Sequence, residues 1–323
     1  MAASRNSRKA DLPERVGQQL AARLSGSESL CVGLSGGCDS VVLLHLLSRL
    51  PRQGRLSAIH VHHGLSPNAD AWAEFCVALC ASLGLPLILR RVAVDRDSGS
   101  GLEAAAREAR YQAFSAVDAD CLVLAHHRGD QAETMLFNLL RGTGVVGAAG
   151  MRPERALGSL RLLRPLLAVS RSEIESYAQA HDLRWIDDES NQDISLSRNF
   201  LRHRVLTVAS QHFPAAEAAL AQAAANFAEA GQLLDELAEA DWLAAADQET
   251  ARLDALSRLS LPRLKNLLRH HLRVLGWRAP VAARLDEFAR QLHAAGPDRH
   301  PELLLPEGVM RAGRGRLHWL AQK

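Results

Sequence analysis

A short segment near the N-terminus, Leu30–Ser40, constrains the fold of this chain more than any other. It reads LCVGLSGGCDS, an apolar run and two adjacent glycines, and a helical pattern follows it through Leu50. In such a strand, turn and helix the backbone can approach a ligand closely, and the N–H groups at the helix start point at bound anions. Phosphate is the expected ligand, with hydroxyl donors from Ser35 and Ser40 and with Mg²⁺ on Asp39. The ending of a Walker loop is absent, and two glycines alone would favour a turn without a ligand.

The N-terminal part of the chain alternates between short apolar runs and amphipathic stretches, which is the pattern of a parallel sheet flanked by helices. We therefore predict an α/β, Rossmann-like domain over residues 1–213. The expected strands are Leu30–Leu34, Leu56–Val61, Leu85–Val94, Cys121–Ala125 and a short one at Arg184–Ile186. The expected helices are Ser40–Leu50, Ala69–Leu83, Leu102–Val117, Gln131–Leu140 and Ser170–His181. A capping box formed by Ser170 and Glu173 marks the start of the last helix.

The amino-acid composition changes near Pro214, where a segment begins that is rich in Ala and Leu and has few patterns typical of β-strands. This change predicts a second, smaller and mainly helical domain over residues 214–323. Leucines recur at helical spacing in Leu261–Leu275 and should form a buried face. The arginines that project away from this face are Arg263, Arg269 and Arg273. The closing segment Leu303–Leu320 has short apolar runs between Gly and Pro and is expected to form a small hairpin.

Composition excludes the disordered and fibrous classes, because 47% of the residues are hydrophobic and 23% are charged. No apolar stretch approaches the roughly 18–20 residues of a membrane-spanning helix. The first ten residues are polar and basic and lack the apolar core of a signal peptide. The five cysteines have neither zinc nor disulfide spacing, so we expect buried thiols and a reducing, cytoplasmic compartment. A formal net charge of +2 neither requires nor excludes nucleic acid.

Paired histidines follow two of the predicted strands. His62 and His63 come at the end of the second strand, and His126 and His127 come at the end of the fourth. Open α/β sheets bind ligands at the carboxyl ends of their strands. The histidine pair at the end of the second strand suggests a metal ligand, and a hydrogen-bonded turn is at least as good an interpretation.

Charged residues recur one helical turn apart in two of the predicted helices. Arg107 and Arg110 share one helix, and Asp130 and Glu133 lie near the start of the next. Guanidinium groups are bidentate donors to phosphates. Two carboxylates at this spacing can attract an ammonium group, hold Mg²⁺ or take a proton from an attacking amine. In the alternative interpretation, the arginines are a solvated helix face and the carboxylates complement the helix dipole.

These motifs resemble those of known families. The sequence SGGCDS after an apolar strand is similar to the loop of the N-type ATP pyrophosphatases, or PP-loop enzymes, which cleave ATP between its α- and β-phosphates and adenylate a substrate. The segments HVHHGLSPNAD, EAAAREARY, LAHHRGDQAET, DDESN and SRNFLRHR extend the resemblance, over Leu30–Arg204, to the tRNA(Ile)-lysidine synthetases. Two positions depart from that family. His62 replaces the usual Asn or Asp, and Gly129 replaces a common Asp, so Asp130 must act without an Asp pair.

The resemblance implies a set of site residues. The residues implied to bind ATP are Ser35, Gly36, Gly37, Cys38, Asp39, Ser40, His63, Arg107, His126 and His127. Asp39 is also the implied ligand of Mg²⁺. The implied catalytic residues are Asp39, Asp130, Glu133 and Arg198.

The resemblance also implies a two-step reaction. ATP adenylates O2 of the wobble cytidine in a tRNA(Ile) with a CAU anticodon, and pyrophosphate leaves. The ε-amine of free L-lysine then attacks C2 and displaces AMP, which converts the cytidine to lysidine and switches codon recognition from AUG to AUA. The expected partners are therefore that tRNA and lysine, with ATP and Mg²⁺ and without a membrane, and a homodimer is one option for the assembly. Our candidates for contact with the phosphates of the tRNA body are Arg263, Arg269 and Arg273.

Two other functions stay open at this stage. A tRNA cytidine thiolase shares the glycine loop, but enzymes of that kind hold an iron–sulfur cluster through Cys-Xaa-Xaa-Cys elements, and this chain has none. A nucleotide-binding module without catalysis would use ATP or AMP as a signal. Incorporation of labelled lysine into tRNA would separate the lysidine-forming enzyme from both.

Overall fold

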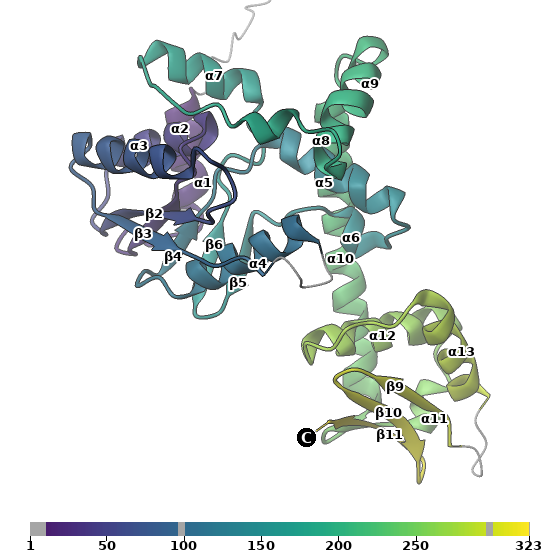
Figure 1. The fold of residues 1–323 in the computed structure, drawn as a ribbon. Helices are drawn as coiled ribbons and strands as arrows, with labels where there is room; N and C mark the ends of the chain where they lie inside the picture. Colours follow the sequence, from purple (N-terminus) through teal and green to yellow (C-terminus); the bar gives the residue numbers. More distant parts are fainter. Residues whose placement is uncertain (1–10, 96–100, 295–299, 323) are drawn as a thin grey trace, which may run out of the picture. The chain divides into compact units, whose positions relative to one another are not determined.

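The computed structural model describes residues 11–95, 101–294 and 300–322, and Figure 1 shows its fold. The chain divides into two compact units, residues 1–226 and 227–323, and the division falls inside the long helix α10 (Ala216–Ala245). Each unit has a hydrophobic core of its own. Within the described ranges, no helix combines the length and the apolar character needed to cross a membrane.

The first unit is built on a six-stranded sheet with the strand order β3-β2-β1-β4-β6-β5. Neighbouring strands pair in parallel from β3 through β6, and β5 pairs antiparallel with β6. This arrangement confirms the predicted parallel-sheet α/β class. The strands are β1 (Leu30–Gly33), β2 (Leu56–His62), β3 (Leu87–Arg91), β4 (Cys121–Val123), β5 (Glu154–Leu157) and β6 (Leu160–Leu163).

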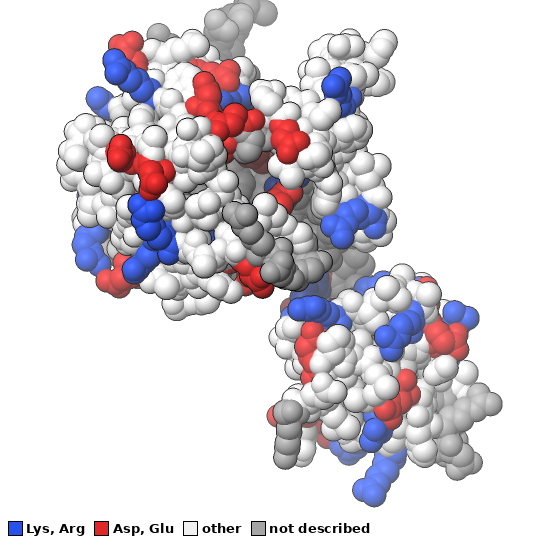
Figure 2. Space-filling view, in the orientation of Figure 1, with Lys and Arg blue, Asp and Glu red and all other residues white. Residues whose placement is uncertain are grey.

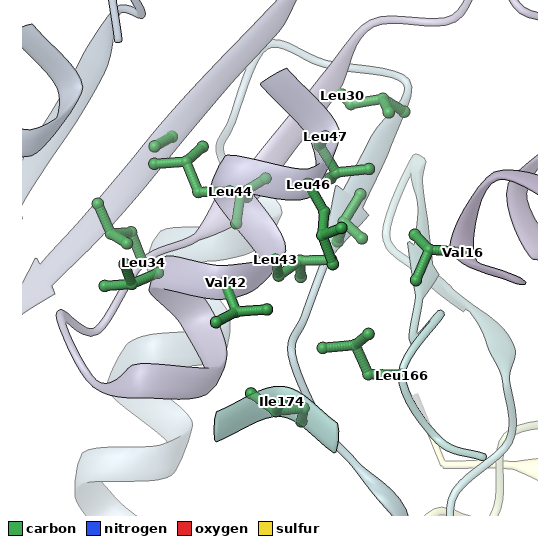
Figure 3. Packing of buried hydrophobic residues seen from close by; sticks show 14 of the residues in the cluster. Val16, Leu30, Leu34, Val42, Leu43, Leu44, Leu46, Leu47, Leu166 and Ile174 are labelled. Carbon is green, nitrogen blue, oxygen red and sulfur yellow. The ribbon is translucent and has the colours of Figure 1, made fainter. Parts of the chain in front are cut away.

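Helices cover both faces of this sheet (Figure 1). Leu30 and Val32 of β1 enter one core with α1, α2 and α7, whereas Cys31 enters a separate core with α4, because successive side chains of a strand point to opposite faces. Figure 3 shows how the leucines of α2 fill the first core. The helices are α1 (Leu12–Ala21), α2 (Cys38–Arg49), α3 (Ala69–Ser82), α4 (Leu102–Ser115), α5 (Arg128–Leu140), α6 (Val145–Ala148), α7 (Arg171–Ala180), η1 (Glu189–Gln192), α8 (Ser197–Phe200), η2 (Leu201–Leu206) and α9 (Thr207–His212).

Two details of the predicted sheet were wrong. The segment Arg184–Ile186 forms no strand. The Ile186 N–H donates a hydrogen bond to the Gly36 carbonyl, which lies in the glycine turn and not in a strand. The hairpin of β5 and β6 was not expected. Each of its strands has only four residues, and apolar and polar residues do not alternate clearly along them.

The predicted capping box at the start of α7 is present. The Ser170 hydroxyl accepts a hydrogen bond from the Glu173 N–H, and the Ser170 N–H donates to the Glu173 carboxylate at 2.8 Å. Arg15 of α1 forms an ion pair with the same carboxylate. Burial acts to raise the pKa of Glu173, but the Ser170 hydroxyl and N–H, together with Arg15, outweigh it and lower the pKa from 4.5 to about 2.

We expect Glu173→Gln to reduce the free energy of unfolding at neutral pH, and we expect this difference from wild type to shrink as pH falls from 4.5 toward about 2. A carboxyl group whose folded-state pKa is depressed stabilises the fold above its unfolded pKa and loses that contribution as pH falls through its folded pKa. Urea unfolding of both proteins over a series of pH values measures the effect. A difference that stays constant with pH would contradict it.

The second unit combines helices with a five-stranded antiparallel sheet of order β7-β8-β11-β10-β9. The expected C-terminal hairpin is present as β10 and β11, but it belongs to this larger sheet. The predicted leucine face is buried, since Leu264, Leu268 and Leu272 of α12 lie in the core of the unit. The elements are α11 (Leu253–Leu256), α12 (Leu261–Val274), α13 (Ala282–His293), β7 (Ala246–Asp247), β8 (Thr250–Arg252), β9 (Glu302–Leu305), β10 (Gly308–Gly313) and β11 (Arg316–Ala321).

The arginines of α12 are held by acidic residues of the same unit. Arg263 pairs with Asp241, which is 3% exposed, and Arg273 pairs with Asp235. Both carboxylates belong to α10, whereas Arg269 lies 3.9 Å from a carboxylate of α13. Figure 2 shows positive and negative side chains interspersed on the visible face of this unit. These pairs favour a role for Arg263 and Arg273 in fastening α12 to α10 over the tRNA contact inferred from the sequence.

Candidate active site

The glycine turn after β1 presents the start of α2 without a side-chain cap. The N-cap residue is Gly37, and its N–H donates to the Ser35 hydroxyl at 3.3 Å. The Ser40 hydroxyl donates to the Gly37 carbonyl at 2.9 Å and lies 3.1 Å from the Ser35 hydroxyl. The N–H groups of a first helical turn have no partner within the helix and favour an anion. The two serines therefore fix the shape of the turn, and the amides of α2 remain as donors for a phosphate.

Gly36 is the position in this turn that requires glycine. Its φ is +91°, in the region that side chains disfavour, and its carbonyl accepts the Ile186 N–H at 2.9 Å. A Cβ at this position would lie 2.6 Å from Cδ1 of Ile186. At Gly37 the nearest atom to such a Cβ is 3.5 Å away, which is ordinary contact.

We expect Gly36→Ala to cost about 1–2 kcal/mol of folding stability through backbone strain, with a further cost from the contact with Ile186. Gly37→Ala is the matched control and should unfold close to wild type. Thermal unfolding of the two variants without nucleotide measures the difference. Equal stabilities would show that the backbone of the turn relaxes freely.

Asp39, in the first turn of α2, is clamped by an arginine. Nη1 of Arg171, the first residue of α7, lies 2.7 Å and 2.6 Å from the two carboxylate oxygens of Asp39. Nε of Arg171 donates to Glu175 at 2.7 Å. Burial raises the pKa of Asp39, and Asp130 adds to this effect, whereas His127 and Arg171 oppose it. Asp39 and Asp130 are therefore close enough to interact electrostatically.

Asp130 and Glu133 project from α5 toward one arginine. Nε of Arg202 donates to Glu133 at 2.5 Å, and Nη2 lies 3.1 Å from Glu133 and 3.5 Å from Asp130. Glu133 is 3% exposed, and burial raises its pKa against the opposing effect of Arg202. Burial would also raise the pKa of Asp130, but His127, His126 and the His127 N–H outweigh it and lower that pKa. The predicted acidic pair thus exists, and it binds a cation of the chain itself.

His127 caps α5, and Gly129 leaves room for its ring. Nδ1 of His127 accepts the Gly129 N–H at 3.0 Å, and the His127 N–H donates to Asp130 at 2.9 Å. A Cβ at Gly129 would lie 2.8 Å from Cε1 of His127. The imidazole therefore occupies space that the Asp expected from the family pattern would need, which accounts physically for the smaller residue here.

Basic residues gather around Tyr111 of α4. The guanidinium groups of Arg107 and Arg155 lie 4.9 Å and 5.0 Å from the centre of its ring. Arg110 points to a different partner and donates to Nε2 of His63 at 3.3 Å. Burial and Arg110 lower the pKa of His63 to about 4, so this histidine is neutral at neutral pH.

Electrostatic interactions connect most of the sequence-predicted residues into one site. Asp39 interacts with His127 and Asp130, and the charges of Arg107 and Arg198 act on His126. The side chain of Arg198 makes no hydrogen bond or ion pair with any other residue that the structure describes, so its charge is available to a ligand. For His63 the structure gives a link to Arg110 but none to the glycine turn.

The sequence did not predict that three arginines would contact residues of the site. They are Arg164, Arg171 and Arg202. Arg164 follows the apolar run of β6, as the other site residues follow β1 and β4, and this repeated pattern was the signal that could have found it. The partners of Arg171 and Arg202 lie far away in the sequence, so no local pattern indicated them.

The histidines at the end of β2 form hydrogen bonds that argue against the metal interpretation. His62 lies 3.1 Å from Asp70, and Nε2 of His63 accepts a hydrogen bond from Arg110 at 3.3 Å. Across the described parts of the chain, no three His, Cys, Asp or Glu side chains form a group suited to a metal. Both carboxylate oxygens of Asp39 lie within 2.7 Å of Nη1 of Arg171, so a Mg²⁺ ion at Asp39 would have to share them with the guanidinium or displace it.

Comparison with known proteins gives the family. Residues 10–209 match the family model of the PP-loop domain, and residues 252–318 match that of the TilS substrate binding domain. A tRNA(Ile)-lysidine synthase of Alkalilimnicola ehrlichii is 46% identical over 95% of this chain and 70% of its own length. The chain belongs to the tRNA(Ile)-lysidine synthase family. Two other members, from Aromatoleum aromaticum and Pseudomonas aeruginosa, are 50% and 47% identical over 90% of the chain and 68% of their own lengths.

A tRNA-modifying enzyme of known structure shares the fold over about two thirds of this chain. The U34-tRNA thiolase NcsA from Methanococcus maripaludis, solved with its [4Fe-4S] cluster, superposes with a TM-score of 0.56 at 18% identity and covers 67% of this chain and 77% of its own. This likeness concerns the fold alone. The five cysteines here are buried, and burial raises the pKa of Cys76, for example, to about 12, so that thiol stays protonated. Protonated thiols dispersed in a core do not form a cluster site.

Proposed function

We propose that this chain forms lysidine in tRNA(Ile) with a CAU anticodon, using ATP and free L-lysine. The observation that carries the proposal is the arrangement of an uncapped glycine turn and an acidic pair in one site of a lysidine synthase family member. The two halves of this site suit the two halves of the reaction, which are activation of a base by ATP and attack by an amine.

The nucleotide half is formed by the glycine turn and the basic residues around it. The amides of Cys38, Asp39 and Ser40 are donors for the phosphates, and a Mg²⁺ ion on Asp39 would neutralise charge on the departing pyrophosphate. Arg107 and Arg198 supply positive charge without a carboxylate partner among the described residues. They can therefore balance the negative charge of the phosphate in the adenylated intermediate.

The lysine half is formed by Asp130 and Glu133. Their pKa values are shifted in opposite directions, and such a divergence assigns different roles to two carboxyl groups. Asp130 stays ionised and attracts the ammonium group of lysine. Glu133, with its raised pKa, is the stronger base and accepts the proton that the amine must lose before it attacks C2. Arg202 occupies these carboxylates in the structure, so lysine must displace its guanidinium or share the oxygens with it.

The decisive experiment offers the purified protein ATP, Mg²⁺, radiolabelled lysine and a tRNA(Ile) transcript with a CAU anticodon. We expect label in the tRNA, together with equal amounts of AMP and pyrophosphate. A transcript with a GAU anticodon is the matched control, because it lacks the wobble cytidine. ATP binding without label in the CAU transcript would refute the proposal and favour a nucleotide-binding module. Thiolation of the same transcript when sulfide replaces lysine would favour a thiolase.

A further inference from the structure

Arg164 is an arginine buried beside the proposed nucleotide half of the site. It follows β6 and is 4% exposed, and it has no carboxylate partner in the described parts of the chain. Nη1 donates to the Arg152 carbonyl at 2.8 Å, and Nε donates to Nδ1 of His126 at 3.2 Å. A buried guanidinium without a counter-ion is costly, so its position calls for an explanation beyond packing.

The bond from Arg164 determines the protonation of His126. A guanidinium has only donors, so Nδ1 of His126 must accept and cannot carry a proton. A neutral imidazole with an accepting Nδ1 carries its proton on Nε2. Burial lowers the pKa of His126 to about 3, and the charges of Arg164, Arg107 and Arg198 act in the same direction, against Asp130. The ring is therefore neutral at neutral pH, and its tautomer is fixed.

The Nε2–H group of His126 is then a donor that is open to a ligand, since it is not among the buried atoms that lack a partner in the described residues. No residue in the described ranges accepts it, whereas Nδ1 is already used. The charged groups that act on the ring are three arginines and Asp130. Asp130 is engaged by the His127 N–H and by Arg202. Surroundings with an excess of positive charge favour an anionic oxygen at the free N–H.

We propose that Arg164 is a positioning residue which fixes His126 as the Nε2–H tautomer, and that this N–H donates a hydrogen bond to a phosphate oxygen of the bound nucleotide. The second half of this statement rests on the proposed function, but the tautomer does not. The role differs from that of His127, whose Nδ1 accepts a bond from its own helix and whose ring caps α5. Arg164 itself is not required to touch the nucleotide.

The tautomer is measured directly by long-range ¹H–¹⁵N NMR of the whole protein labelled with ¹⁵N-histidine, with His126 assigned from the spectrum of His126→Gln. We expect a pyridine-type shift at Nδ1 and a pyrrole-type shift at Nε2, unchanged over the neutral range. Arg164→Met should give a mixture of tautomers, and Arg164→Lys, which restores a donor, should recover the wild-type pattern. Arg161→Met, which removes a surface arginine of β6, should leave the His126 signals unchanged.

Nucleotide binding tests the second half. On titration with a non-hydrolysable ATP analogue and Mg²⁺, the Nε2 signal should shift more than the Nδ1 signal. His126→Gln places an amide N–H near the position of Nε2, whereas His126→Asn places one near Nδ1. We expect the Asn variant to bind the analogue about tenfold more weakly than the Gln variant. Circular dichroism and the remaining histidine signals show whether each variant is folded.

The outcomes separate this inference from the proposed function. A pyridine-type Nε2 in the wild type, or equal affinities of the Asn and Gln variants, would overturn the inference even if lysine is incorporated into tRNA. The expected tautomer and affinity difference, together with failure to form lysidine, would uphold the inference and overturn the proposed function. If Arg164→Met unfolds, the wild-type spectrum and the pair of His126 variants still decide.

Discussion

Asp39→Asn is expected to slow tRNA-dependent release of pyrophosphate from ATP by about 10²–10³-fold, which is the usual cost of removing one charge-stabilising group from such a site. The amide keeps the size of the side chain but cannot balance Mg²⁺ and the triphosphate. Stability should change little, because burial raises the pKa of Asp39 and the neutral amide avoids that cost of desolvation. Pyrophosphate release as a function of Mg²⁺ concentration and thermal unfolding are the two measurements.

Glu175→Gln is the matched control for this prediction. Glu175 is the other partner of Arg171, with an Nε to carboxylate distance of 2.7 Å, and we assign it no contact with ATP. Its loss should leave pyrophosphate release near the wild-type rate. If both variants were equally slow, the important feature would be the placement of Arg171 rather than the charge of Asp39. If Asp39→Asn were as fast as wild type, the proposed role of the glycine turn in binding Mg²⁺ with ATP would fail.

The parts of this site that the sequence predicted are those encoded locally. The turn at Gly36 and the helix that follows it, predicted from Ser40 and observed from Cys38, follow from the order of apolar residues, glycines and helix formers. Asp130 and Glu133 share a helix face because they are three residues apart. Each of these features depends on neighbours within one turn of the chain, so it can be recognised before the fold is known.

The parts that the sequence did not predict are pairings between distant segments. Arg171 meets Asp39 across 132 residues, and Arg202 meets Glu133 across 69. Helical periodicity predicts that Arg263 leaves the leucine face of α12, but it does not show that Asp241 of another helix is there to receive it. The full C-terminal sheet was not predicted for the same reason. Its strands are short and are stabilised by pairing with one another, which a local sequence pattern does not show.

The pair of Glu133 and Arg202 gives the second prediction with a large effect. We expect Glu133→Gln to slow lysine transfer by about 10²-fold, the usual contribution of a general base, while adenylation of the tRNA continues. We expect its stability at neutral pH to change little, because burial raises the pKa of Glu133 against the effect of Arg202 and the neutral amide avoids that cost of desolvation. Pyrophosphate release, lysine incorporation and urea unfolding are measured on the same preparation.

Arg202→Met should destabilise the fold more than Glu133→Gln, because it leaves the buried Glu133 and the partly exposed Asp130 without their guanidinium. Its loss of stability should grow as pH rises, since a carboxyl group with a raised folded-state pKa stabilises the fold only while it is protonated. The double variant of Arg202→Met and Glu133→Gln also removes the buried negative charge and leaves only the partly exposed Asp130 without Arg202, so it should regain part of that stability without regaining lysine transfer. Normal lysine transfer in that double variant would show that Glu133 is a structural partner of Arg202 and that the proton goes elsewhere. Lost transfer in the single variant Glu133→Gln, with a wild-type unfolding curve, would assign Glu133 to the chemistry, because the fold and Arg202 would then be intact and the base alone would be missing.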